Sequence, residues 1–183
     1  MKGSSAINQA GVCGTRGVAD AANTPGARYY PSAWTDSSGY LWLFGGQGWD
    51  SAGDQGLLND LWRFDPSTGN WTWITGSSTR NQFGNYGVAG VPADTNVPGA
   101  RYNAASGIDS SQALWLFGGA GADSIGDANY LNDVWRYDIL SFQWSGDHRD
   151  LHAYPTRRSS ALGLPADANT PGARFCVAAW TET

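Results

Sequence analysis

Lysine is nearly absent from this chain of 183 residues: Lys2 is the only one, and almost all of the positive charge comes from arginine. The formal net charge is -5, and the closest basic pair is Arg157 and Arg158. Nucleic acids and anionic membrane surfaces both require clustered positive charge. The sequence therefore argues against a nucleic-acid partner and against binding to such membranes.

Long apolar runs are missing as well. No stretch approaches the roughly 20 consecutive apolar residues that a membrane-spanning helix needs, so we expect no membrane insertion. Residues 1–10 lack the apolar segment of a signal peptide, and we predict none in this chain.

Cysteine is scarce, with Cys13 and Cys176 far apart in segments of different kinds. A disulfide needs a close and specific geometry that spacing alone does not show. The interpretation that we favour is two free thiols, and a disulfide between them stays open.

What the chain does contain is a repeat. The string Pro-Gly-Ala-Arg begins at residues 25, 98 and 171, so successive copies lie 73 residues apart. Leu-Trp-Leu-Phe-Gly-Gly begins at residues 41 and 114, and Trp71 recurs as Trp144 with the same offset. A gapless period of this length indicates one supersecondary unit used repeatedly.

Each unit contains four short strand signals. In the first copy they cover residues 28–34, 41–44, 60–65 and 71–74. The second signal is a continuous apolar run closed by Gly-Gly, which is typical of a strand buried on both faces. No segment shows a sustained period of 3.6 residues, so the sequence predicts an all-β fold with almost no helix.

Four short strands with apolar residues on both faces cannot close a core alone, but radial stacking into a propeller buries both faces. A double glycine ending the second strand, an aromatic residue in the third and a tryptophan in the fourth resemble the kelch motif. The chain is also similar to bacterial kelch proteins that resemble the central domain of galactose oxidase. The resemblance implies a kelch-type β-propeller of about two and a half four-stranded blades with a 73-residue period.

The period exceeds the roughly 50 residues usual for kelch repeats, and the excess falls in loops rich in Gly, Asn and Pro. We therefore predict a leading inter-blade loop (1–27), a blade (28–75), a loop (76–100), a second blade (101–148), a loop (149–173) and the first strand of a third blade (174–183). Because propellers typically contain about four to eight blades, we expect a fragment of a larger propeller whose remaining blades lie in cis.

Arginine opens the first strand of each unit, at Arg28, Arg101 and Arg174. Radial repetition would bring these guanidinium groups to one mouth of the channel, where they could hold an anionic ligand or a partner's carboxylates. The alternative, which we favour, is that each arginine pairs with a repeated carboxylate such as Asp65 or Asp138.

The motif Gly-Gly-x-Gly-x-Asp at residues 45–50 and 118–123 matches the calcium-binding β-rolls. The carboxylates that could bind Ca²⁺ there are Asp50, Asp54, Asp123 and Asp127. β-rolls repeat the motif about every nine residues, whereas this chain has it once per unit. We therefore favour structural turns in the loop after the double glycine, and we predict no metal or cofactor.

Tryptophans on strands, such as Trp42, Trp62 and Trp71, are expected in the core. Aromatic residues in loops are better candidates for contact with a ligand, and Trp49 and Tyr130 are the ones that we select.

Galactose oxidase-like catalysis implies a copper ion held by two tyrosines and two histidines, with one tyrosine cross-linked to a cysteine. His148 and His152 are the only histidines, and neither they nor the cysteines match that site, so no catalytic residue is carried over. We predict a binding or scaffolding module for a protein or carbohydrate partner. The alternative is part of a copper-radical carbohydrate oxidase whose active site lies in blades outside this chain. Composition and resemblance together favour an extracellular or cell-envelope protein.

Overall fold

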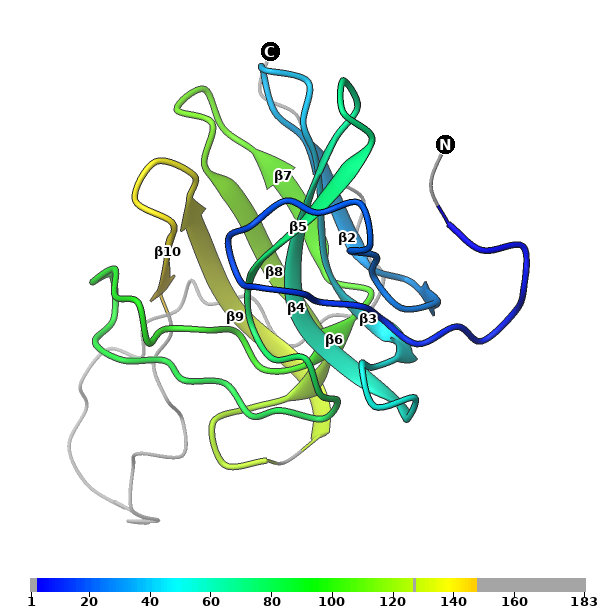
Figure 1. The fold of residues 1–183 in the computed structure, drawn as a ribbon. Coiled ribbons are helices and arrows are strands. Elements are labelled where there is room, and N and C mark those ends of the chain that lie inside the picture. The colour runs from blue at the N-terminus through cyan, green and yellow to red at the C-terminus, as the bar shows by residue number, and fades with distance from the viewer. Residues whose placement is uncertain (1–2, 127, 148–183) are drawn as a thin grey trace, which may run out of the picture.

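The computed structural model describes residues 3–126 and 128–147 of the chain (Figure 1). Within these residues the fold is all-β, with two antiparallel sheets and no helix. Among these residues there is therefore no helix that is long and apolar enough to cross a membrane. Arg174, His148, His152 and Cys176 lie outside the described residues, as does the predicted first strand of a third blade.

The two sheets have the same topology. The first contains β1 (Arg28–Tyr29), β2 (Ser32–Thr35), β3 (Leu41–Trp49), β4 (Gln55–Asp65) and β5 (Asn70–Thr75). The second contains β6 (Arg101–Tyr102), β7 (Ala105–Ile108), β8 (Leu114–Ala122), β9 (Ala128–Asp138) and β10 (Gln143–Asp147). The strand order is β1-β3-β4-β5 with β2 also on β3, and β6 to β10 reproduce this arrangement.

The first strand of each unit is broken in two, whereas the sequence predicted one continuous strand. Tyr30 has a φ of 51° and its counterpart Asn103 a φ of 55°, so the chain bends at the same place in both sheets. Pro31 follows the first bend and has no N–H to donate to β3. The two short pieces nevertheless both pair with β3, through Arg28↔Gly48 and Ser32↔Phe44.

The second strand runs on through the double glycine, so the predicted loop over residues 45–50 is wrong. The pairing of β3 with β4 shifts register between Phe44 and Gly46, which marks a β-bulge. Gly45 has a φ of 63°, and a Cβ there would lie 2.7 Å from the backbone oxygen of Arg101. Glycine is needed because the left-handed backbone and the neighbouring sheet leave no room for a side chain. The actual turn comes at residues 50–54, and β4 therefore begins at Gln55 rather than at Asp60.

The core lies between the two sheets. It consists of Trp34, Trp42, Phe44, Leu61 and Ile74 from the first sheet and Leu114, Leu116, Trp135, Tyr137 and Trp144 from the second. Aromatic rings meet across it. The ring centroids of Trp42 and Tyr137 lie 5.9 Å apart, and those of Phe44 and Trp144 lie 5.4 Å apart. Full burial of each such side chain contributes about 1.5–3 kcal/mol, so this interface is a main source of stability. The prediction that the strand tryptophans are buried is confirmed for Trp42 and Trp62, whereas Trp71 is only half-buried.

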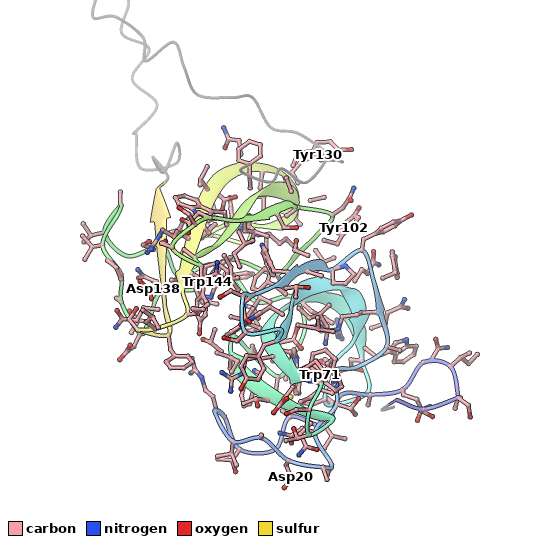
Figure 2. All side chains as sticks on the ribbon, turned by 90° about the horizontal axis from the view of Figure 1, so that it is seen from above. Asp20, Trp71, Tyr102, Tyr130, Asp138 and Trp144 are labelled. Atoms are coloured by element: carbon pink, nitrogen blue, oxygen red, sulfur yellow. The ribbon has the colours of Figure 1, made fainter. Side chains whose placement is uncertain are left out.

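The long segments before each sheet are hydrogen-bonded to the edge strand of the sheet that follows them. Residues 9–27 pair internally through Val12↔Thr24 and bridge to β5 through Asp20↔Trp71, which Figure 2 shows at one edge of the molecule. Residues 82–100 repeat this arrangement on β10 through Ala93↔Trp144. In the rest of the article each of these segments is called a covering loop.

Candidate functional site

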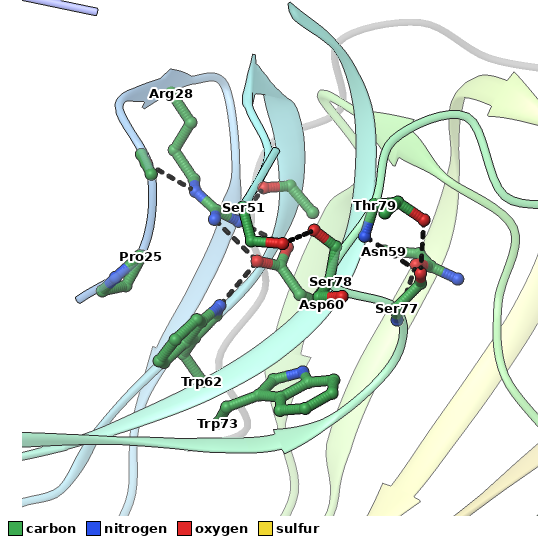
Figure 3. Close-up of polar contacts among 12 residues, drawn as sticks. Pro25, Arg28, Ser51, Asn59, Asp60, Trp62, Trp73, Ser77, Ser78 and Thr79 are labelled. Carbon is green, nitrogen blue, oxygen red and sulfur yellow. Dashed lines mark hydrogen bonds and ion pairs between the residues drawn. The ribbon is translucent and has the colours of Figure 1, made fainter. Parts of the chain in front are cut away.

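The first arginine cluster joins β1 to β4. Arg28 donates through Nη1 and Nη2 to the two carboxylate oxygens of Asp60, at 2.6 and 2.7 Å (Figure 3). Trp62 Nε1 donates to Asp60 Oδ2 at 2.6 Å. Asp60 and Trp62 lie on the same face of β4 because side chains alternate along a strand. The pair is bidentate, which is the strong geometry for arginine and a carboxylate.

The second cluster repeats the first and adds a phenol. Arg101 donates to both oxygens of Asp133, at 2.5 and 2.7 Å, and its side chain is only 1% exposed. Tyr86 Oη donates to Asp133 Oδ2 at 2.8 Å. Burial alone would raise the pKa of Asp133, but the charge of Arg101 and the hydrogen bonds that Asp133 accepts hold it below its usual range.

The pairing of arginine with a repeated carboxylate is present, but the predicted partner was wrong. Asp65 lies at the far end of β4 and accepts hydrogen bonds from Ser67 in the turn. Five residues of extended chain separate Asp65 from Asp60, which is about 16 Å at 3.3 Å per residue. Asp60, and not Asp65, therefore pairs with Arg28. In the second sheet Asp138 likewise lies five residues beyond Asp133, which is the partner of Arg101. Both described guanidinium groups bind inside the fold and do not point to a ligand.

Cys13 occupies the position that Tyr86 has one period later. It is a half-buried free thiol. Burial and the nearby charge of Asp60 raise its pKa to about 11. Thiolate is the reactive form of cysteine, so this thiol is poorly suited to nucleophilic chemistry at neutral pH.

The carboxylates selected as weak calcium candidates bind the backbone of the turns. Asp50 Oδ1 accepts hydrogen bonds from the N–H groups of Ala52 and Asp54, each at 2.9 Å. Asp123 Oδ1 does the same for Ile125 and Gly126. These contacts agree with structural turns. Asp54 is ion-paired at the surface with Arg80, at 3.6 Å.

Asp127 lies outside the described residues. Across residues 3–126 and 128–147, no group of three or more His, Cys, Asp or Glu side chains is arranged to hold a metal ion.

Of the two aromatic residues selected from the sequence, Tyr130 is the more accessible, at 58% exposed. Trp49 is half-buried at the end of β3, where it pairs with Gln55. Both therefore belong to strands and not to the loops in which the sequence placed them. Register puts Tyr130 and Tyr102 opposite the same residue, Ala120, so the two tyrosines flank a small side chain on one face of the second sheet (Figure 2).

Two further aromatic residues were missed. Tyr29 and Tyr30 are 45% and 61% exposed, and their rings lie edge to face with centroids 5.3 Å apart. Sequence reasoning assigned both to a continuous strand, which hides one of two adjacent side chains, whereas the bend at Tyr30 leaves both exposed. The signals for this bend were Pro31, which cannot donate to a strand ladder, and Asn103 at the equivalent place, since asparagine tolerates a positive φ. Asn103 N–H donates to Tyr30 O at 2.9 Å, so the bends of the two sheets lie side by side.

A polar pocket of about 230 Å³ lies between the end of β5 and the second covering loop. Arg16 and Asp94 are its charged lining residues, with Asn59, Ser77 and Gln82 beside them. The guanidinium of Arg16 donates to Ile74 O at 2.9 Å, and Asp94 accepts a hydrogen bond from Gln143. Both charges are thus already engaged by the fold.

No protein-family model matches the chain, and no curated protein matches it. Among solved structures, the chain is similar to YjhT, at 18% sequence identity and a TM-score of 0.49. The match covers 68% of this chain and 39% of YjhT, so the chain spans about two fifths of that protein's length. A likeness of this extent carries no argument about activity, and the all-β fold rests on the strand pairing described above.

Proposed function

We propose that this chain is part of a kelch-type β-propeller and acts as a binding module for a protein or carbohydrate partner. Support comes from an antiparallel meander with a broken inner strand that recurs 73 residues later, and from two sheets that share an apolar core. On this proposal residues 28–75 and 101–148 are blades, and residues 174–183 begin a third. From composition and the kelch resemblance we further propose that such a protein lies outside the cell or in its envelope.

Two tyrosines on one face of the second sheet carry the binding role: Tyr130, which is 58% exposed, and Tyr102, which is half-buried. Tyrosine offers a large amphipathic ring at a low cost in conformational entropy, which suits recognition surfaces. Tyr102 and Tyr130 stand on strands either side of β8, and neighbouring strands lie about 4.8 Å apart. The two side chains are therefore separated by about two strand spacings over Ala120. A ring-shaped group such as a pyranose is the kind of ligand that we propose for this face.

The polar chemistry of the described residues supports binding over catalysis. The buried carboxylates of Asp60 and Asp133 already accept hydrogen bonds from arginine and tryptophan. The pKa of Cys13 is raised, which disfavours a nucleophile at neutral pH.

The test is a glycan array together with a pull-down of partner proteins, using the wild type and the Tyr102→Ala and Tyr130→Ala variants. We expect a retained ligand whose affinity falls about tenfold or more in each variant, since aromatic anchors dominate binding energies. Phe142→Ala is the matched control, because Phe142 is 51% exposed in the turn between β9 and β10. Binding that survives both tyrosine substitutions would contradict the assignment of this surface.

A further inference from the structure

The polar pocket between β5 and the second covering loop holds two opposite charges that do not pair with each other. Arg16 and Asp94 both line it, and its volume is about 230 Å³. Across the residues that the structure describes, neither side chain takes part in an ion pair. Opposite charges in so small a space attract each other, so the fold must hold them apart.

Hydrogen bonds to the two sheets fix each charge in place. Arg16 Nε donates to Ile74 O at 2.9 Å, and Arg16 Nη2 donates to Thr75 Oγ1, so β5 fixes the guanidinium. Asp94 Oδ1 accepts a hydrogen bond from Gln143 Nε2 at 2.8 Å, so β10 fixes the carboxylate. Arg16 Nη1 and Asp94 Oδ2 have no hydrogen-bond partner among the described residues. Each charge therefore keeps an atom for a further contact.

The rest of the lining offers both polar and apolar contacts. Gln82 Nε2 donates to Arg80 O at 2.9 Å, and its Oε1 has no partner within the described ranges. Phe83 is 57% exposed, and its ring lies against Gly126, where a Cβ would be 2.5 Å from Phe83 Cζ. Sites for drug-sized ligands measure roughly 300–1,000 Å³, so this smaller pocket suits a smaller molecule.

Two of the lining positions depart from the repeat. Arg16 stands where the next copy has Ala89, and Phe83 stands where the other copies have Ala10 and Thr156. The blade design therefore does not require a guanidinium or an aromatic ring at these places. Both groups are particular to this pocket, which is what a ligand site requires and what a purely structural crevice does not.

We propose that this pocket binds a free α-amino acid with an apolar or aromatic side chain. Its carboxylate accepts hydrogen bonds from Arg16, its ammonium group donates to Asp94, and its side chain packs on Phe83. Guanidinium groups are well suited to carboxylates, and one molecule that carries both charges satisfies both sides of the pocket. The proposal does not rest on the binding role of the tyrosine face, because neither Tyr102 nor Tyr130 lines this pocket.

The test measures binding of L-phenylalanine to the full chain by isothermal titration calorimetry at pH 7. Two analogues keep one charge each: 3-phenylpropionate has the carboxylate and 2-phenylethylamine has the ammonium group. L-Phenylalanine should bind about tenfold or more tightly than either analogue, because each analogue loses hydrogen bonds to a charged group. A wild type that does not bind L-phenylalanine at millimolar concentration, or analogues that bind equally well, would overturn the proposal.

Two variants assign the charges to their partners. Arg16→Gln and Asp94→Asn should each weaken binding of L-phenylalanine about tenfold or more. Arg16→Gln should also remove the advantage of L-phenylalanine over 2-phenylethylamine, and Asp94→Asn its advantage over 3-phenylpropionate. Arg136→Gln is the matched control, because Arg136 pairs with Asp138 at 3.4 Å and does not line the pocket.

Circular dichroism of each variant checks that the fold is retained, and the comparison of analogues on the wild type holds whether or not a variant folds. Tyr130→Ala should leave binding of L-phenylalanine unchanged, which distinguishes this site from the tyrosine face. Unchanged binding in both Arg16→Gln and Asp94→Asn would place the amino acid elsewhere and contradict the assignment of the pocket.

Discussion

The two sheets carry the same residue pattern but do not bury the same residues. Trp42 is 2% exposed and Trp115, one period later, is half-buried, while Trp144 is 1% exposed and Trp71 is half-buried. Each of these four tryptophans is buried where it faces the other sheet and partly open where it faces away. The repeat therefore sets where an apolar side chain stands, and the neighbouring sheet decides whether that side chain contributes its full burial energy.

The two arginine clusters differ in a second way. Asp133 binds Arg101, Trp135 and the hydroxyl of Tyr86, whereas Asp60 has Cys13 at the position of the tyrosine. The bidentate pair and the tryptophan are shared, and the third group varies. Both sheets therefore use the arginine–aspartate pair and the tryptophan hydrogen bond to hold their first strand in place.

The largest effect is expected from removal of the shared carboxylate. Asp133→Ala leaves Arg101 buried without its partner, which costs about 3–5 kcal/mol of unfolding free energy. Asp60→Ala should fall in the same range or slightly below it, because the side chain of Arg28 is 5% exposed against 1% for Arg101. Urea unfolding measures both, and costs under about 1 kcal/mol would show that the clusters do not hold the first strands.

Acid adds a check on the same cluster. The pKa of Asp133 is lowered in the folded protein, so its stabilisation is complete above the unfolded pKa and is lost as pH falls through the folded pKa. The stability difference between the wild type and Asp133→Ala should therefore be full at neutral pH and shrink below about pH 4. Unfolding curves at a series of pH values follow this difference, and a gap that widens in acid would contradict the assignment.

Tryptophan truncation sharpens the comparison of faces. Trp144→Ala should cost about 3–5 kcal/mol, since a large side chain is removed from a closed core. Trp71→Ala at the equivalent position should cost about half as much, because its face is partly open in the single chain. Thermal unfolding at low protein concentration compares the two variants. Equal costs for the two variants would contradict the difference in burial between the two positions.

The reactivity of Cys13, which stands where the second cluster has Tyr86, tests how far this thiol is buried. In a Cys176→Ser background, Cys13 should react with iodoacetamide about a hundredfold more slowly at pH 8 than an unperturbed thiol, because its pKa is raised from 9.0 to about 11. The rate should climb with pH until the thiol is ionised. A rate at pH 8 like that of a free peptide thiol would show that Cys13 is not half-buried beside Asp60.

The smallest effect is expected from the extra hydrogen bond of the second sheet. Tyr86→Phe removes one donor from Asp133, which still binds Arg101 and Trp135, and should cost about 1 kcal/mol. Chemical unfolding of the variant beside the wild type measures this difference. A loss as large as that of Asp133→Ala would mean that the tyrosine, and not the arginine, is the main partner of the carboxylate.

Pattern alone predicted much of the fold and less of the candidate site. The apolar run at residues 41–44 and the alternation at residues 60–65 located two strands, because burial imposes those periods on any sheet. The same reasoning stopped the second strand at the double glycine, since it could not show that Arg101 passes close to Gly45. Tyr29 and Tyr30 were overlooked because their exposure depends on a bend and not on composition.

From the sequence by itself came the 73-residue repeat, the all-β character, the central part of most strands and the apolar residues available for a core. These follow from local periodicity, which each segment carries without reference to the rest of the chain. Only the tertiary structure decided that Arg28 pairs with Asp60 instead of Asp65, and that Trp42 is buried while Trp115 is half-open. Those outcomes depend on which strand ends meet and which sheet lies opposite, and both are properties of chain segments brought together from distant positions.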